Sequence, residues 1–340
     1  MRILVTGATG FLGVQLVERL VAAGHEVRAF ARSAMTHPGL AGAEAFQGSL
    51  EDPARVREAL VGVEAVYHLA GLVSFDPDDG RKMYRLHVDA TRELLRAVRE
   101  AGVGRVILAS TSGAIAVSRE RRIIDETADA PITVVGRWPY YLSKIYEEQL
   151  TIAYCRQHQI PLVVMNPSLL MGPGDERLSS TWTVLKFLQR DLPLMPNGGI
   201  SFADVRDVAD AFVTALTKGE LYGRHLMGVN MEMDEFFGRL SRMTGVPTPP
   251  KLNLPPAVQV LGAKALERFS RWRGVEPPVD AASVDIGEHW FFLDDAKARR
   301  LLDWAPRDPH LTLHDTVQDI LPRMAPGHLP GTWGRLGLRR

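Results

Sequence analysis

Short apolar runs alternate, in the first half of the chain, with segments whose apolar residues recur at helical spacing. The runs predict strands at residues 3–5, 27–30, 65–67, 106–108 and 162–164. The spaced segments predict helices over about 12–21, which Gly24 ends, over 86–98, which Gly102 ends, and from Pro139 onward. Strands separated by helices of this length form a parallel sheet with helices on both faces. The pattern therefore predicts a doubly wound α/β fold.

The alternation loosens after about residue 170. Five prolines lie between Pro247 and Pro256, and the pair Pro277-Pro278 follows. Because proline ends helices, we expect short helical pieces that cap the sheet rather than extend it. The expected division is a main domain at 1–170, to which about 200–230 returns, a smaller lobe at 171–320, and a flexible basic tail at 321–340.

One helical stripe of this lobe is apolar and has basic neighbours. The stripe comprises Val258, Leu261, Ala265, Leu266 and Phe269, beside Lys264, Arg268, Arg271 and Arg273. Such a helix could lie on a membrane or close over a hydrophobic substrate. The ordinary arrangement, which we expect here, turns the stripe toward the core and the charges toward solvent.

Composition narrows the class of protein. The 340 residues carry 40 Lys and Arg against 40 Asp and Glu, and this balance argues against a protein that neutralises nucleic-acid phosphates. No stretch approaches the roughly 18 apolar residues of a membrane-spanning helix. The one cysteine, Cys155, has no partner for a disulfide within the chain, and no signal-peptide pattern opens the sequence, so we expect a cytoplasmic protein. No cluster has metal-ligand spacing, and no metal is expected.

A glycine-rich loop joins the first strand to the first helix. Gly7 permits the tight turn, Gly10 lets backbone amides approach a pyrophosphate at the positive end of the helix, and Gly13 lets helix and strand pack closely. A loop in this position, between strand and amphipathic helix, predicts a dinucleotide site.

The end of the second strand indicates which dinucleotide. NAD sites usually have a carboxylate there for the ribose 2′-hydroxyl, but this strand ends Ala29-Phe30-Ala31-Arg32-Ser33. A guanidinium suits a 2′-phosphate. We therefore expect NADP, with NAD as the other possibility, and a solvated surface role as the alternative for Arg32.

Tyr140 and Lys144 are four residues apart on a predicted helix, so both side chains emerge on one face. A phenol has a pKa of about 10, and a neighbouring ammonium together with an oxidised nicotinamide would favour the phenolate. Tyr141 lacks a lysine at the same spacing and is expected to pack in the interior.

Three hydroxyls, Ser110, Thr111 and Ser112, follow the fifth strand at the carboxyl edge of the sheet, where such folds bind ligands. One of them could hydrogen-bond a substrate carbonyl beside the tyrosine. The spacing alone does not choose among them, and a turn rich in Ser and Thr is also common.

Together these motifs give a family resemblance over roughly residues 1–320. With the loop at 6–13, the hydroxyl cluster, Tyr140 and Lys144, and Asn166-Pro167-Ser168 before Gly172-Pro173-Gly174, the sequence resembles the extended short-chain dehydrogenase/reductases. It is most similar to the dihydroflavonol reductase and 3β-hydroxysteroid dehydrogenase branch through residues 27–32, 202–209 and 295–298.

The resemblance implies a Rossmann domain, a substrate-binding C-terminal lobe and specific roles. Tyr140 would be the acid-base residue, Lys144 would orient the nicotinamide ribose and lower the tyrosine pKa, and Thr111, or alternatively Ser112, would bind the carbonyl. A strand register is harder to slip than a turn, and this favours Thr111. The implied cofactor-binding residues are Gly7, Thr9, Gly10, Phe11, Leu12, Gly13, Arg32, Ser49, Leu50, Leu69, Ala70, Gly71, His87, Tyr140, Lys144, Pro167 and Ser168.

Three positions depart from the family pattern. His87 replaces a common Asn, Ser49 replaces an acidic residue expected near adenine, and Asn166 replaces an arginine common in sugar-nucleotide enzymes. A lone helical histidine is more often a satisfied structural residue than a functional one.

The leading hypothesis is an NADP-dependent oxidoreductase acting on a ketone or secondary alcohol of a small, fairly hydrophobic molecule. A sugar-nucleotide epimerase or dehydratase that retains NAD is the alternative, and a cofactor-sensing protein without turnover is the second. The resemblance also implies a homodimer through helices near 82–101 and 140–158, with Met83, Leu94 and Tyr146 available for the contact.

Overall fold

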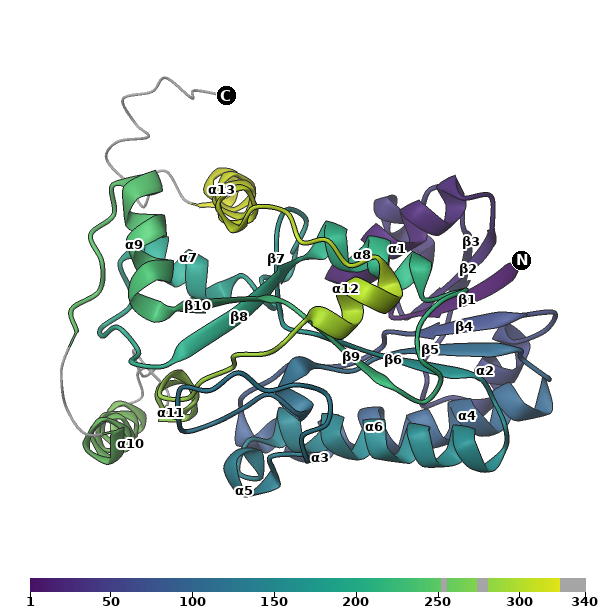
Figure 1. Ribbon diagram of the computed structural model, residues 1–340, viewed down its shortest axis with the longest axis horizontal. Coiled ribbons are helices and arrows are strands. Elements are labelled where there is room, and N and C mark those ends of the chain that lie inside the picture. The colour runs from purple at the N-terminus through teal and green to yellow at the C-terminus, as the bar shows by residue number, and fades with distance from the viewer. Residues whose placement is uncertain (252–255, 274–280, 325–340) are drawn as a thin grey trace.

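The computed structural model describes residues 1–251, 256–273 and 281–324. A seven-stranded sheet in the order β3-β2-β1-β4-β5-β6-β9 forms its centre, and all its neighbouring strands are parallel (Figure 1). The strands are β1 (Arg2–Thr6), β2 (Glu26–Ala31), β3 (Glu44–Gln47), β4 (Ala65–His68), β5 (Arg105–Ala109), β6 (Leu162–Pro167) and β9 (Arg224–Met227). The chain winds outward from β1 to β3 and then outward again from β4, so the predicted doubly wound fold is confirmed.

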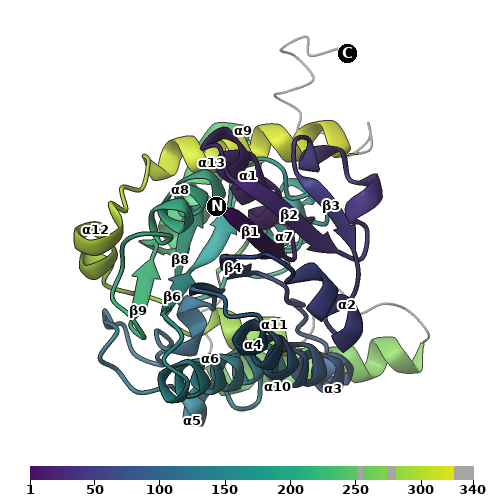
Figure 2. The same ribbon diagram turned by 90° about the vertical axis from the view of Figure 1, so that its right-hand side faces the viewer.

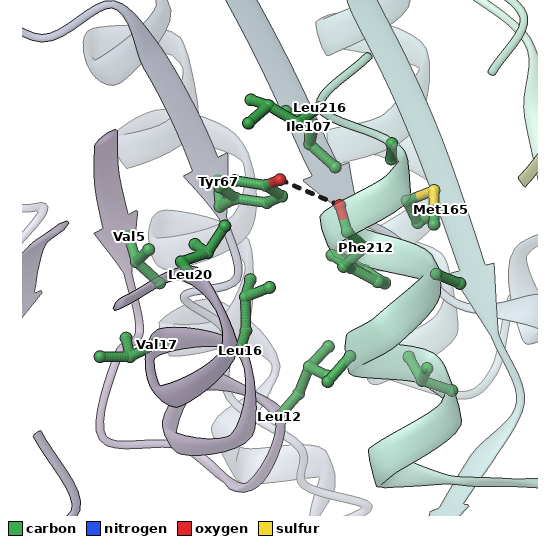
Figure 3. Packing of buried hydrophobic residues seen from close by; sticks show 14 of the residues in the cluster. Val5, Leu12, Leu16, Val17, Leu20, Tyr67, Ile107, Met165, Phe212 and Leu216 are labelled. Atoms are coloured by element: carbon green, nitrogen blue, oxygen red, sulfur yellow. Dashed lines mark hydrogen bonds between the residues drawn. The ribbon is translucent and has the colours of Figure 1, made fainter. Parts of the chain in front are cut away.

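Helices α1 (Phe11–Ala22) and α8 (Val205–Thr214) cover one face of this sheet. Figure 3 shows Leu16 and Leu20 of α1 beside Tyr67, whose hydroxyl donates a 2.9 Å hydrogen bond to the carbonyl oxygen of Phe212 on α8. This contact joins segments 145 residues apart in the sequence, and it places α8 on the main sheet.

The opposite face is covered by α2 (Pro53–Ala59), α4 (Thr91–Glu100) and α6 (Pro139–Gln157), so helices lie on both sides of the sheet (Figure 2). The helix predicted over 86–98 is part of a longer helical stretch. It starts with α3 (Gly80–Tyr84) and passes through a π-helical turn, η4 (Arg85–Ala90), into α4. Such π-turns often occur at functional sites.

A second, three-stranded sheet in the order β10-β8-β7 supports the smaller lobe. Its strands are β7 (Leu169–Met171), β8 (Gly199–Asp204) and β10 (Val229–Glu232), packed with α7 (Trp182–Gln189), α9 (Met233–Thr244) and α13 (Pro309–Ile320). The helical pieces were predicted here, and the three strands beside them were not, because strands this short carry too few residues to show a clear alternation.

The remaining elements are short apart from one helix. They are α5 (Ile132–Val135), α10 (Pro256–Trp272), α11 (Ala281–Gly287) and α12 (Ala296–Leu302), with the 3-10 turns η1 (Ala34–Thr36), η2 (Pro38–Leu40), η3 (Pro77–Asp79), η5 (Ser112–Ala114) and η6 (Leu321–Arg323). No helix in the described part of the chain has both the length and the apolarity needed to cross a bilayer.

The expected core-facing stripe of α10 was wrong. Leu261 is 69% exposed and Phe269 is 51% exposed, whereas Ala263 and Ser270 are the buried residues among the described side chains of this helix. The large apolar side chains therefore point outward and the small residues point inward.

Two further expectations concern the molecular surface. Met83 and Leu94 are buried within the protomer, so of the three proposed dimer contacts only Tyr146 is exposed. Leu321 and Met324 pack into the core of the smaller lobe, and the start of the predicted tail is therefore ordered structure. The rest of that tail, residues 325–340, lies outside the described residues.

Candidate active site

The glycine-rich loop has room only for glycine at its two tightest points. Gly7 has φ +69°, and a Cβ there would lie 2.7 Å from the backbone nitrogen of Ala70. A Cβ on Gly13 would lie 2.3 Å from the carbonyl oxygen of Gly7. Helix α1 then begins after Gly10 without a side-chain cap. Its first amides and the positive end of its dipole fit a pyrophosphate.

Neighbouring loops close around this cradle. The Thr6 hydroxyl accepts hydrogen bonds from the backbone nitrogens of Leu69 (3.2 Å) and Ala70 (3.3 Å), which holds the segment 69–71 beside the glycine-rich loop. The side chains of Leu12 and Leu50 are buried in the core. Only their backbone is therefore placed to meet a cofactor.

The hydroxyl of Ser49 is engaged locally, because it accepts a 3.2 Å hydrogen bond from the backbone nitrogen of Glu51. Arg32 lies exposed directly after β2. The backbone nitrogen of Gly7 donates to the Phe30 carbonyl (3.1 Å), so this strand end is adjacent to the glycine-rich loop. Within the described residues, Arg32 has no carboxylate partner, and its guanidinium is available to an anion.

The structure brings together the three predicted catalytic residues. Tyr140 lies in the first turn of α6, Lys144 lies one turn later, and Thr111 follows β5. The Thr111 hydroxyl lies near the Tyr140 phenol and lowers its pKa, and the Lys144 ammonium donates a 2.8 Å hydrogen bond to the Ala109 carbonyl. Ser112 is also buried, but the contact with the phenol is made by Thr111.

The protein groups around Tyr140 favour its neutral form. Burial, and then the negative charge of Glu147, raise the pKa of Tyr140 to about 12, and the hydrogen bond from Thr111 offsets only part of this rise. Lys144 is not among the groups that shift this pKa, and its ammonium is paired with the Glu147 carboxylate. Lys144 and Tyr140 thus share a face without direct ionic coupling.

Glu147 belongs to a buried polar network that reaches the glycine-rich loop. Its Oε1 atom lies 3.4 Å from Thr91 Oγ1 and 3.5 Å from His68 Nε2. His68 Nδ1 in turn lies 2.8 Å from Thr6 Oγ1. Burial opposes ionisation of Glu147, but the Lys144 ammonium and the hydrogen bond from His68 together hold its pKa well below the usual range. The carboxylate is therefore charged and anchors Lys144.

Glu148, the next residue, ties three strands together beneath the hydroxyl cluster. Its Oε2 accepts hydrogen bonds from Ser110 Oγ (2.5 Å) and Asn166 Nδ2 (2.7 Å), and its Oε1 accepts one from Arg224 Nε (2.6 Å). Asn166 Nδ2 also donates to the Thr111 carbonyl at 3.2 Å. Asn166, the departure noted in the sequence, thereby fixes the backbone of Thr111.

His68, Glu147 and Glu148 also belong to the site but were not predicted from the sequence. The two glutamates lie three and four residues after Lys144, a spacing that places them on its face of the helix, and this was the available signal. Nothing local marked His68, because its partners come from three different elements.

His87 lies beside Tyr140 with both ring nitrogens engaged. The Leu72 backbone N–H donates to Nε2 (2.9 Å), so the proton is on Nδ1, which lies 2.9 Å from Ser143 Oγ. Ser143 then donates to the Tyr140 carbonyl (2.8 Å). Burial, chiefly, lowers the pKa of His87 to about 4. These contacts favour a structural role over direct contact with a cofactor.

At the other side of the site, Pro167 ends β6 and Ser168 follows it, both in buried positions. The Ser168 hydroxyl has no hydrogen-bond partner among the described residues, and it packs closely against Gly228. A buried hydroxyl without a protein partner suits a polar ligand group.

Aromatic rings line the vicinity of Tyr140. The ring centroid of Tyr140 lies 6.2 Å from Phe75 and 5.2 Å from Tyr141, and Tyr141 lies 5.9 Å from Phe291. A Cβ on Gly113 would lie 2.1 Å from the Tyr141 ring, so glycine is required there for Tyr141 to pack as predicted. The described residues contain no cluster of His, Cys, Asp or Glu that could hold a metal.

A glycine cradle at a helix N-terminus, with tyrosine, lysine and hydroxyl at the carboxyl edge of the sheet, defines an NAD(P)-dependent oxidoreductase acting on CH–OH or carbonyl groups. The chain belongs to the NAD dependent epimerase/dehydratase family, whose model matches residues 3–226.

Similar proteins include reductases and epimerases. The putative dihydroflavonol 4-reductase of Synechocystis sp. is 31% identical over 86% of this chain and 87% of the relative. Sterol demethylase protein B of Methylococcus capsulatus is 33% identical over 93% of this chain and 97% of the relative. The UDP-glucose 4-epimerase of Thermus thermophilus, solved with NAD, has a TM-score of 0.72 at 23% identity, covering 94% of this chain and 98% of that chain. This last likeness concerns the fold alone.

Proposed function

We propose that the protein is an NADP-dependent oxidoreductase that interconverts a ketone and a secondary alcohol of a lipophilic, ring-bearing molecule, with Tyr140 as the acid-base residue. The observation that carries this proposal is that the Thr111 hydroxyl lies close enough to the Tyr140 phenol to lower its pKa, one helical turn from the anchored Lys144. A carbonyl oxygen seated between the two hydroxyls would meet a proton donor and a second hydrogen-bond donor at once.

The residues present fit a nicotinamide dinucleotide. Gly7, Gly10 and the first turn of α1 would hold its pyrophosphate, and Ser168 would meet a polar group at the other end of the site. The bound cofactor supplies or accepts the hydride. Tyr140 passes its proton to the carbonyl oxygen in the direction of reduction and takes it back in oxidation.

Lys144 and Thr111 are held so that they need no rearrangement during this proton transfer. Glu147 and the Ala109 carbonyl fix the ammonium, while Glu148 and Asn166 fix the backbone that carries Thr111. Such pre-organisation of the groups around a reacting atom lowers the barrier more than the same groups would if they were mobile.

The substrate class follows from the rings around the site. Phe75, Tyr141 and Phe291 present apolar faces and edges near Tyr140, which suit a flat or polycyclic apolar molecule. The names of the relatives agree with this class, since they refer to a dihydroflavonol and a sterol.

A carbonyl panel tests the proposed reaction. We expect NADPH to be oxidised in step with product when the purified protein is given apolar ring ketones, and we expect protein purified without added cofactor to carry little nicotinamide. A full equivalent of retained NAD, with conversion of a nucleotide sugar and no net change in nicotinamide absorbance, would instead establish the epimerase alternative.

Cofactor preference is expected to depend on Arg32. Arg32→Asp should reverse a preference for NADP over NAD, because a carboxylate repels the 2′-phosphate and can accept from a 2′-hydroxyl. Titration of both cofactors into wild type and variant measures this, with Arg242→Asp as the control, because Arg242 is exposed on α9 of the smaller lobe. Equal affinity of the wild-type protein for both cofactors would leave Arg32 as a surface charge.

The two candidate hydroxyls should differ in importance. Thr111→Ala is expected to lower kcat by about tenfold or more, because it removes the hydroxyl proposed to hydrogen-bond the reacting oxygen beside Tyr140. Ser112→Ala should have the smaller effect. The reverse order in steady-state kinetics would transfer the carbonyl-binding role to Ser112.

A homodimer and a cytoplasmic location remain predictions. Tyr84 and Tyr146 pack edge to face with centroids 6.3 Å apart and are both exposed on the α3 and α6 surface, so they replace Met83 and Leu94 as the proposed dimer contacts.

A further inference from the structure

Helix α10 turns its apolar side to solvent. Val258, Leu261, Phe269 and Trp272 are between 50% and 81% exposed, although helices of globular proteins normally bury such residues. Successive spacings of three, four, four and three through Ala265 align these residues along one side of the helix. We call this set, Val258, Leu261, Ala265, Phe269 and Trp272, the outer face.

Cations lie along the edges of the outer face. Lys264, Arg268 and Arg273 are exposed, and the Arg273 guanidinium lies 5.3 Å from the ring centroid of Phe269. Among the described residues none of the three cations pairs with a carboxylate. Glu267 falls on the inner side with Ala263 and Ser270, so the groups that the described side chains of this helix present outward are apolar or positive.

The position of α10 connects this surface to the substrate side of the active site. Helix α10 packs against α11, as Figure 1 shows at the edge of the smaller lobe. Asp285 of α11 accepts a 3.0 Å hydrogen bond from Trp138 Nε1, and the Trp138 ring packs on Tyr141. The outer face is therefore separated from the aromatic rings near Tyr140 by a single helix.

We propose that the outer face of α10 binds the surface of a bilayer that contains anionic lipids. Exposed Trp, Phe and Leu side chains can enter the boundary between headgroups and acyl chains, while flanking Lys and Arg attract anionic headgroups. The positive charge is local, since the whole chain has a formal net charge of zero. A second copy of the chain is a poorer occupant, because a symmetric contact would bring these unpaired cations together.

This inference rests on the proposed function and extends it to the source of the substrate. A bilayer bound by α10 would place a dissolved lipophilic molecule on the side of the protein where α11 and Trp138 lead to the aromatic rings near Tyr140.

Vesicle flotation with the full-length protein tests the proposal. Vesicles of phosphatidylcholine mixed with phosphatidylglycerol should carry the protein, and vesicles of phosphatidylcholine alone should carry much less. Arg268→Gln should weaken the binding about fivefold, and added salt should weaken it as well. Leu261→Ser combined with Trp272→Ser should abolish it.

Trp182→Ser is the matched control, because Trp182 is 52% exposed on α7 and lies outside the outer face. This variant should bind vesicles like the wild type. NADPH binding should be unchanged in all variants, because none of the substituted residues lies in the cofactor cradle.

Three results would overturn the proposal. The first is no binding of the wild-type protein to anionic vesicles, and the second is equal binding by the wild type and the Leu261→Ser/Trp272→Ser variant. The third is light scattering that shows a dimer for the wild type and a monomer for this variant, since the outer face would then be covered by a second copy. Failure of the proposed function is distinguishable, because it would abolish NADPH oxidation and leave vesicle binding intact.

Discussion

Replacing Tyr140 by phenylalanine is expected to lower kcat by about 10³-fold, within the range typical of a lost general acid or base. The substitution removes only the hydroxyl that donates or accepts the proton and keeps the ring that packs against Phe75 and Tyr141. Nicotinamide absorbance measures the rate, and a separate titration should show that NADPH still binds.

Tyr141→Phe provides the control for this experiment. Tyr141 is partly buried beside Tyr140, and burial, chiefly, raises the pKa of its phenol. Its hydroxyl has no role in the proposed proton transfer, so we expect only a small change in kcat. A Tyr140→Phe variant with near-native kcat would remove Tyr140 from the mechanism.

Replacing Glu147 by glutamine is expected to lower the free energy of unfolding by about 3–5 kcal/mol, the usual cost of breaking a buried ion pair. Both partners are within the interior, since Glu147 is 0% exposed and Lys144 is 5% exposed. The variant would leave the ammonium without a counter-charge. Denaturant unfolding measures the loss, and Lys144→Met combined with Glu147→Gln should recover much of it, because neither charge is then buried alone.

The same variant should change the dependence on pH. The native pKa of Glu147 lies below its ordinary value of 4.5, so its contribution to stability is complete above that value and is lost as the pH falls toward the native pKa. Glu147→Gln should therefore be less stable than wild type near neutral pH, and the difference should shrink in acid. A difference that does not change with pH would contradict the assigned charge state.

Activity gives a second measure of the same residue. The charge of Glu147 raises the pKa of Tyr140, so removing that charge should lower this pKa and move the alkaline limb of the kcat profile toward neutral pH. A purely structural role for Glu147 would leave this limb in place. The comparison thereby separates positioning of Lys144 from support of the fold.

Much of the fold was accessible from local patterns. Apolar runs and helical spacings identified β1, β2, β4, β5 and β6 with the helices between them, because a buried parallel strand and a one-sided helix each leave a clear period. Short elements were missed, including β3 and the three strands of the smaller lobe, since few residues define no period. The glycine-rich loop was also predictable from the sequence. Backbone crowding at Gly7 and Gly13 allows no other residue, so the fold requires glycine at these positions.

The site was predictable as far as its motifs are local. Tyr140 and Lys144 share one helix, and the hydroxyl cluster directly follows one strand, so spacing alone associates them with the carboxyl edge of the sheet. In the sequence, the register of the preceding strand favoured Thr111 over Ser112 as the partner of Tyr140. The proximity of the Thr111 and Tyr140 side chains in the structure supplies the stronger argument.

The sequence by itself determined the fold class, the cradle for a dinucleotide and the pair of residues proposed for proton transfer, because each depends on neighbours along the chain. Only the tertiary structure decided that Lys144 is held by Glu147, that His68 links this pair to Thr6, and that α10 faces outward. These features depend on which distant elements pack together. Whether a nearby charge raises or lowers the pKa of Tyr140, and which side of a helix is buried, depends on residues of those distant elements. The local sequence pattern does not contain them.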